Sequence, residues 1–204
     1  MPLLDPNQTY TFSKFFDLKI VPKDLAKEFG YSLTRTWLEL PQYSQELDRL
    51  EDLRSRFVEI LPYCDLSNEA SRREVLISPV LLDLIHYTKS ELRIEYSVQV
   101  DRQLQGYFDY LLENHSKLLV VEAKKGDLDF GFTQLVAELI ALDRWQVDNP
   151  QSHFVGAVTT GTIWQFAQID RRQQHIEQGL DSYRVPNDLD SLMRILVQSL
   201  KSDS

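Results

Sequence analysis

The sequence has little cysteine, little glycine and no long hydrophobic run. Its 204 residues include one cysteine and seven glycines. Because Cys64 is alone, it cannot form an internal disulfide, and zinc sites built from several cysteines are excluded. We therefore expect a reducing, cytoplasmic location. The longest apolar runs are short, such as residues 118–121, so we expect no membrane-spanning helix and no membrane partner. The opening residues, MPLLDPNQTYTF, lack the features of a signal peptide, and we expect none.

Positive charge is also scarce in this chain. Lys and Arg number 22 and Asp and Glu number 31, which gives a formal net charge of −9. Such a chain lacks the broad basic face with which proteins coat nucleic acid or anionic membranes by charge alone. The composition, 43% hydrophobic and 26% charged, is otherwise that of an ordinary globular protein. A chain of this length buries a core without disulfides or a structural metal.

The hydrophobic pattern divides the chain into two segments. Residues 1–62 are expected to form a mainly helical N-terminal extension that packs on the core. In this extension the pattern predicts helices at 22–28 and 44–61 and a strand at 31–38. Residues 63–204 are expected to form the core domain.

The core segment alternates between helical and strand patterns. A helix is expected to begin at Ser67 or Asn68, both good N-cap residues, and Pro79 interrupts or recaps it. Strands are expected at 92–100, 107–113, 118–124, 154–159 and 163–169, and helices at 130–147 and 189–200. This order predicts an α/β fold with a mixed β-sheet flanked by helices.

The second and third core strands are expected to form a hairpin that brings charged side chains together. Residues 114–117 form its loop, and a symmetric loop places Asp109 opposite Glu122. Opposed carboxylates repel each other unless a cation lies between them. Because side chains alternate along a strand, Glu122 and Lys124 share one face. The combined set of Asp109, Glu122 and Lys124 suits a divalent cation with an ammonium group beside it.

The strings GYFD at 106–109 and VVEAKK at 120–125, followed by a QLVAE helix, resemble a known group of nucleases. They are similar to the PD-(D/E)XK superfamily, which has the restriction-endonuclease-like fold, and within it to the nuclease domains of type I restriction subunits. The resemblance covers residues 66–169 and departs from the family's name at Phe108, where a proline would stand. It implies that Asp109 and Glu122 bind Mg²⁺, for which Mn²⁺ can substitute, and that Lys124 serves the attacking water.

The resemblance implies further site residues. The backbone carbonyl of Ala123 is expected as a further metal ligand, and Gln134 matches a catalytic-site glutamine that the family often places on the following helix. A glutamate of the first helix often joins the metal site. Here both Glu69 and Glu74 are candidates, because Pro79 blurs the helical phase that would choose between them.

Each of these residues also has a purely structural interpretation. Asp109, Glu122 and Lys124 would then form a solvated charge cluster across the strands. Gln134 and Glu138 would be the polar side of an amphipathic helix. The two glutamates of the first helix would simply favour the positive end of its dipole.

The sequence thus predicts a Mg²⁺-dependent endonuclease that hydrolyses DNA phosphodiester bonds, with RNA left open as a substrate. Arg72, Arg73 and Lys125 are candidate phosphate contacts, and surface solvation is their structural alternative. The alternative function is a catalytically inactive protein of the same fold that acts as an interaction or regulatory subunit. Because many nucleases of this fold are dimers and this chain is acidic, a second copy or a more basic protein is the expected protein partner.

Overall fold

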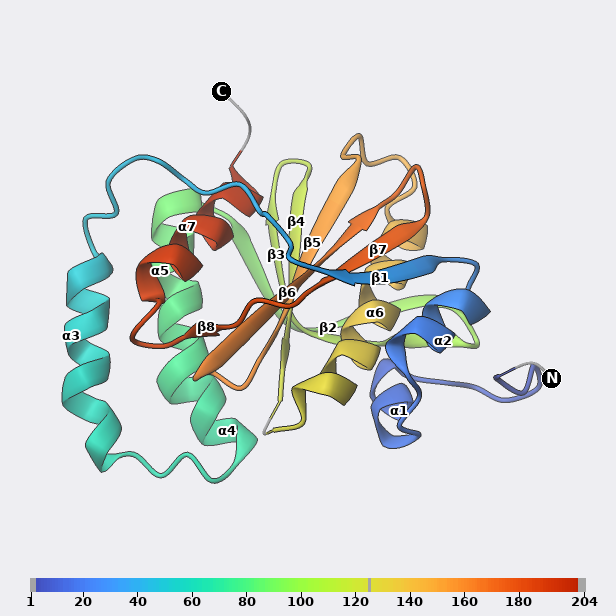
Figure 1. The fold of residues 1–204 in the computed structure, drawn as a ribbon, viewed down its shortest axis with the longest axis horizontal. Coiled ribbons are helices and arrows are strands. Elements are labelled where there is room, and N and C mark those ends of the chain that lie inside the picture. Colours follow the sequence, from blue (N-terminus) through green and yellow to red (C-terminus); the bar gives the residue numbers. More distant parts are fainter. Residues whose placement is uncertain (1–2, 125, 202–204) are drawn as a thin grey trace.

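A mixed β-sheet runs through the computed structural model, which describes residues 3–124 and 126–201. Within these residues the sheet has eight strands in the order β1-β7-β6-β5-β4-β3-β2, with β8 paired to β6 (Figure 1). The pairs β1–β7 and β4–β5 are parallel, and the other pairs are antiparallel. The strands are β1 (Ser32–Thr36), β2 (Glu91–Asp101), β3 (Leu104–Asn114), β4 (Lys117–Ala123), β5 (His153–Thr159), β6 (Ile163–Asp170), β7 (His175–Gly179) and β8 (Tyr183–Arg184).

Helices cover both faces of this sheet. The helices α1 (Phe12–Asp17), α2 (Pro22–Glu28) and α6 (Leu128–Trp145) pack on one face, and α3 (Leu50–Ile60), α4 (Glu69–Arg72), α5 (Ser78–Thr88) and α7 (Leu189–Leu200) lie on the other (Figure 1). Val120 belongs to the core under α6, and Val121 to the core under α5 and α7. Both faces of β4 are therefore buried, which explains its continuous apolar run. The predicted α/β class, a mixed sheet flanked by helices, is confirmed.

The N-terminal segment contributes short helices and a strand of the sheet. Helix α2 has the predicted bounds, and β1 pairs with β7 in parallel. The predicted helix at 44–61 is wrong in its first part, because α3 begins only at Leu50. The carbonyls of Tyr43 and Gln45 accept hydrogen bonds from the Arg194 guanidinium of α7, and this anchors the preceding chain as a loop. The short 3-10 turn Leu61–Tyr63 follows α3. The domain boundary after residue 62 stays a prediction.

The first core helix runs on through Pro79. Asn68 is its N-cap and accepts a hydrogen bond from the Ser71 N–H at 2.8 Å. Between α4 and α5 lies a π-helical segment, Arg73–Ile77, which ends two residues before Pro79. Because proline has no N–H to donate, the altered bonding pattern of a π-helical segment accommodates it without a break. The extra residue in this turn also shifts the helical phase.

The β3–β4 hairpin has the predicted register with a tighter turn than expected. Asn114 and Lys117 are paired, so the turn consists of two residues and not four. The pairing ends at Tyr110 and Val121. Asp109 and Glu122 are the next residues in this register, one step beyond the last pair, so they are not directly paired as predicted.

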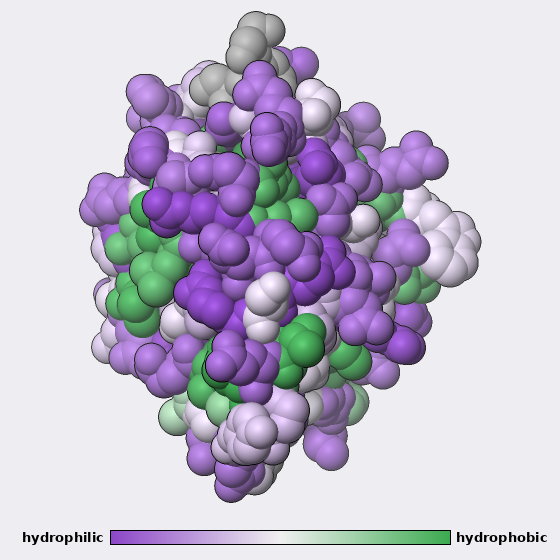
Figure 2. Space-filling view, turned by 90° about the vertical axis from the view of Figure 1, so that its left-hand side faces the viewer, coloured by the Kyte–Doolittle hydropathy of each residue, from purple (hydrophilic) through white to green (hydrophobic). Residues whose placement is uncertain are grey.

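The surface formed by α3 and its surroundings is largely hydrophilic, with separate hydrophobic patches (Figure 2). Val58 of α3 and Leu82 of α5 are each 61% exposed. Among the described residues, no helix is both long enough and apolar enough to cross a membrane.

Candidate active site

A cavity of about 430 Å³ lies where β4 ends, between β2, β3, α4, α6 and the start of α1. It brings together four residues that the sequence predicts as catalytic, Asp109, Glu122, Lys124 and Gln134. The full set of lining residues is Thr11, Ser13, Glu69, Glu95, Gly106, Tyr107, Asp109, Glu122, Lys124 and Gln134. Three strands and three helices therefore supply polar side chains to one cavity.

The structure also distinguishes the two candidate glutamates of the first helix. Glu69 is the first residue of α4 and lines the cavity. Glu74 lies in the π-helical segment, is exposed, and does not line this cavity. Of the two, Glu69 is the one placed beside the other acidic residues.

Asp109 extends the contact between β3 and β4 beyond their last backbone pair. Its Oδ2 atom accepts a hydrogen bond from the Ala123 N–H at 2.9 Å. Its Oδ1 atom lies 3.6 Å from Nη1 of Arg73. The side chain thus satisfies a backbone donor at the point where the two strands separate, and this fixes the carboxylate at the cavity wall.

Glu122 and Lys124 form a buried ion pair. Lys124 Nζ donates to Glu122 Oε1 and also lies 5.2 Å from the ring centroid of Phe16. Burial, reinforced by the charge of Asp109, raises the pKa of Glu122 to about 7, although Lys124 acts in the opposite direction. Burial alone would lower the pKa of Lys124, but the Glu122 carboxylate outweighs it and the pKa of Lys124 is raised.

Helix α6 brings a second buried carboxyl group to Glu122. Glu138 is fully buried, and its Oε1 atom accepts a hydrogen bond from Gln134 Nε2 at 2.9 Å. Burial and the neighbouring Glu122 raise the pKa of Glu138 well above its usual range. This raised pKa favours the neutral form of Glu138 beside the Glu122 carboxylate.

Three buried oxygens of this cluster have no hydrogen-bond partner among the described residues. They are Glu122 Oε2, Gln134 Oε1 and Glu138 Oε2. With the Asp109 carboxylate and the Ala123 carbonyl, they are hard oxygen donors of the kind that Mg²⁺ and Mn²⁺ prefer. The chemistry of the donor set fits a divalent cation.

The carboxylates of this cluster contact other protein groups. Asp109 is engaged by Arg73 and Ala123, and Glu122 by Lys124. Over residues 3–124 and 126–201, no group of three or more His, Cys, Asp or Glu side chains is placed to hold a metal ion. Binding of a cation therefore requires Glu122 and Asp109 to exchange protein partners for the ion.

The predicted phosphate contacts are held by the protein itself. Arg72 Nη1 donates to the Thr160 carbonyl at 3.0 Å. The Arg73 side chain is only 17% exposed and contacts Asp109. Lys125 lies outside the described residues. The two arginines thus serve as internal contacts in this conformation.

Glu95 is a site residue that was not predicted from the sequence. Glu138 was noted with Gln134 on the helix of the nuclease resemblance, with the polar side of that helix as its structural interpretation. In β2, Ile94 pairs with Tyr110 and Tyr96 pairs with Phe108, so Glu95 faces Asp109 between them. Counting from the loop of the first hairpin would not have found it, because the register shifts between Gln99 and Asp101.

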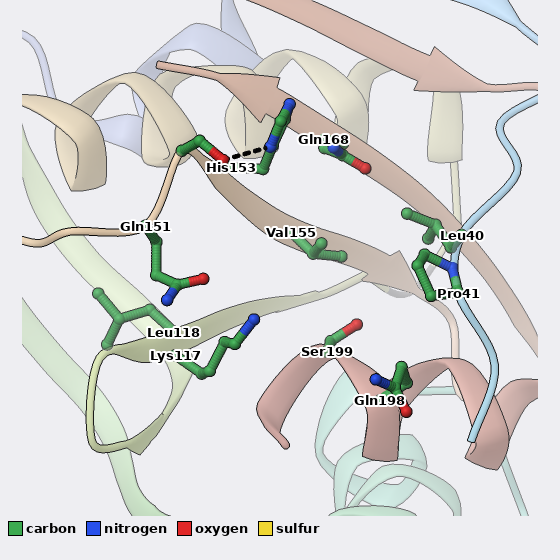
Figure 3. A pocket seen from close by; sticks show the side chains of 11 residues that line it. Leu40, Pro41, Lys117, Leu118, Gln151, His153, Val155, Gln168, Gln198 and Ser199 are labelled. Carbon is green, nitrogen blue, oxygen red and sulfur yellow. Dashed lines mark hydrogen bonds between the residues drawn. The ribbon is translucent and has the colours of Figure 1, made fainter. Parts of the chain in front are cut away.

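A second cavity of about 240 Å³ lies at the opposite end of β4, against the end of α7 (Figure 3). None of the predicted site residues lines it. Several of its polar side chains bond to protein groups: Ser152 to His153, and Ser199 to the Ile195 carbonyl. We therefore place the candidate active site at the other end of the strand.

Comparisons of the chain with family models, with curated proteins and with solved structures found no match. The class of the protein is therefore defined by its own fold and site. The protein is an α/β protein with a buried carboxylate and lysine cluster at the end of a hairpin strand.

Proposed function

We propose that this protein is a Mg²⁺-dependent endonuclease of the PD-(D/E)XK superfamily that hydrolyses phosphodiester bonds in DNA. The observation that carries the proposal is the convergence of Asp109, Glu122, Lys124 and Gln134 in one cavity. These side chains come from two strands and a helix, and they are the residue types that metal-assisted phosphodiester hydrolysis needs.

Each residue has a role that follows from its chemistry and position. Asp109, Glu122 and the Ala123 carbonyl hold the cation, with Glu69 as a further acidic group at the cavity wall. Bound Mg²⁺ acidifies a coordinated water and offsets negative charge on a phosphate. Lys124, once released from Glu122, donates its N–H groups to the attacking water or to the developing negative charge.

Gln134 and Glu138 support this arrangement from helix α6. The Gln134 amide is fixed by its bond to Glu138, which leaves its carbonyl oxygen unpaired at the cavity. This oxygen can accept a hydrogen bond from a water or contribute to the cation's coordination through one.

The proposal is tested by incubating the purified protein with supercoiled plasmid, single-stranded DNA and single-stranded RNA, in Mg²⁺, in Mn²⁺ or in EDTA. We expect cleavage of DNA with either metal and none with EDTA. Cleavage that survives Asp109→Ala or Glu122→Ala contradicts the proposed site. If the protein cleaves only RNA, the proposed site is supported and DNA is not the substrate.

A specific observation favours a second candidate function, a catalytically inactive subunit of the same fold. Both oxygens of Asp109 and one oxygen of Glu122 contact Arg73, Ala123 and Lys124, as expected for a charge cluster that serves stability. No cleavage with either metal, together with a stable protein partner in pull-down experiments, supports this candidate. Metal-dependent cleavage by the purified protein rules it out.

Partners and location are part of the same proposal. The net charge of −9 supports delivery to DNA by a more basic protein, and double-strand cleavage would be served by a homodimer. Light scattering after size-exclusion chromatography distinguishes a dimer from a monomer. The single cysteine, Cys64, agrees with a reducing, cytoplasmic location.

A further inference from the structure

Arg73 connects two carboxylates that line the cavity. Its Nη1 atom lies 3.6 Å from Asp109 Oδ1 and 3.5 Å from Glu95 Oε1. Its Nε atom donates to the Tyr110 hydroxyl at 3.1 Å, and the guanidinium lies over that ring, 5.0 Å from the centroid. Tyr110 thus anchors the arginine, while one nitrogen is shared between carboxylates of neighbouring strands.

Both carboxylate contacts of Arg73 are long. A charge-assisted N–H···O hydrogen bond usually measures about 2.7–2.9 Å. The bond to Tyr110 has an ordinary length, whereas the two ion pairs do not. A guanidinium held in this way can move from Asp109 toward Glu95 and keep its anchor on Tyr110.

Glu95 has a backbone conformation that packing does not explain. Its φ angle is 51°, in the left-handed region, although it lies in the middle of β2. For a residue other than glycine this conformation costs about 1 kcal/mol or more. The side chain is 67% exposed, so burial of the side chain does not compensate for this cost. Its carboxylate forms an ion pair with Arg73, which lies beside the candidate metal ligand.

We propose that Arg73 competes with the divalent cation for Asp109, and that Glu95 takes the guanidinium when the cation binds. This inference rests on the proposed function, because it needs a cation at Asp109. A guanidinium and a divalent cation on one carboxylate repel each other. Arg73 neutralises Asp109 before the cation arrives. Glu95 keeps Arg73 paired afterwards, since an unpaired cation in a partly buried site is costly.

Titration calorimetry with Mn²⁺ tests this exchange without measuring catalysis. We expect Arg73→Gln to bind Mn²⁺ about ten times more tightly than the wild type. Glu95→Gln weakens binding when Arg73 is present and has much less effect in the double variant, since Glu95 acts through Arg73. Arg93→Gln is the matched control. Arg93 also lies between two carboxylates, Glu91 and Glu113, but away from the cavity, and we expect wild-type affinity.

Circular dichroism confirms that each variant is folded. If Arg73→Gln does not fold, Arg73→Lys replaces it. We expect Arg73→Lys to raise Mn²⁺ affinity by a smaller factor, because the shorter lysine side chain cannot reach Tyr110 and Asp109 together. Equal or weaker Mn²⁺ binding by the Arg73 variant overturns the inference and leaves the metal site in place. The inference is also overturned if Glu95→Gln changes Mn²⁺ affinity equally in the wild type and in the Arg73→Gln variant. Absence of Mn²⁺ binding in every folded variant overturns the inference and the proposed metal site together.

Discussion

Glu122 and Glu138 are fully buried carboxyl groups, and burial raises the pKa of both. The charge of Asp109 adds to this effect at Glu122, and the charge of Glu122 adds to it at Glu138. An unfolded glutamate ionises near pH 4.3, whereas Glu122 does so at about 7 in the folded chain. Between these values the folded chain binds more protons than the unfolded chain. The free energy of unfolding therefore falls as the pH rises through this window.

We expect Glu138→Gln to remove the part of this pH dependence that Glu138 contributes and to leave the part of Glu122. The amide matches the shape of a protonated glutamate, still accepts from Gln134, and donates to Glu122 without a proton to lose. At pH 8 the variant is expected to be more stable by about 1–3 kcal/mol, with little change at pH 5. Urea unfolding at both values measures this. Glu51→Gln, on the exposed side of α3, is the control. If the stability of the variant depends on pH as steeply as that of the wild type, Glu138 does not have a raised pKa in the folded chain.

Lys124→Met should separate catalysis from cation binding. Loss of a group that acts on the attacking water or on developing charge costs about 10²–10⁴ in rate. Mn²⁺ affinity should not fall, because the substitution removes a positive charge beside Glu122. Cleavage kinetics and Mn²⁺ titration measure the two effects, with the exposed Lys27→Met as control. A parallel loss of both activities would place Lys124 in a structural role.

The sequence could place Asp109, Glu122, Lys124 and Gln134 near one another because strand alternation and a hairpin register act over short distances. The choice of Glu69 over Glu74 could not be made this way, since it depends on a π-helical turn with no clear sequence signal.

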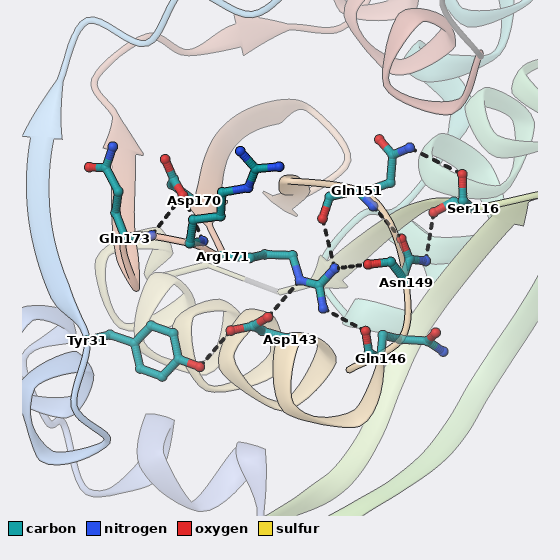
Figure 4. Close-up of polar contacts among 10 residues, drawn as sticks. Tyr31, Ser116, Asp143, Gln146, Asn149, Gln151, Asp170, Arg171 and Gln173 are labelled. Carbon is teal, nitrogen blue, oxygen red and sulfur yellow. Dashed lines mark hydrogen bonds and ion pairs between the residues drawn. The ribbon is translucent and has the colours of Figure 1, made fainter.

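At the scale of elements, Arg171 connects α6, the chain before β5 and the end of β6 (Figure 4). Its Nε atom donates to Asp143 at 2.7 Å. Its other nitrogens donate to the carbonyls of Gln146, Asn149 and Gln151. One side chain therefore satisfies the backbone acceptors of a loop that has no ladder of its own.

Arg171→Lys is expected to destabilise the fold by about 2–4 kcal/mol. A single ammonium cannot reproduce the planar fork, and buried carbonyls lose their donors. Chemical denaturation measures the change. Arg172→Lys, an exposed neighbour, is the control and should lie within about 0.5 kcal/mol of the wild type. Equal stability of the two variants would show that the loop is held by other contacts.

The helices and strands that were predicted well from the sequence are those with a clear periodic pattern of apolar side chains. Helix α7 has the predicted bounds, and the predicted core strands agree to within a few residues. Strand β7, HIEQG, was missed because it is short and rich in polar residues. Its pairing with β1 and β6 forms it, and pairing between distant segments has no local signal.

At the scale of the whole molecule, the net charge of −9 disfavours binding to DNA by charge attraction alone. We expect weak binding of duplex DNA at physiological salt without a divalent cation, and stronger, salt-sensitive binding with one. Fluorescence anisotropy of labelled duplex DNA, in EDTA and with Mg²⁺ added to the Asp109→Asn variant to limit cleavage, measures both. Tight binding in EDTA would show that a basic surface, and not the cation, attracts the nucleic acid.

The central claim is that the cavity at the end of β4 hydrolyses phosphodiester bonds. The most direct measurement follows plasmid cleavage in Mg²⁺ by the wild type, by Asp109→Asn and by Asp52→Asn, at equal concentrations of folded protein. Asparagine keeps the shape of Asp109 and removes its charge, and Asp52 is exposed on the distant helix α3. We expect cleavage by the wild type and by Asp52→Asn, and none by Asp109→Asn. Equal cleavage by all three proteins would contradict the claim.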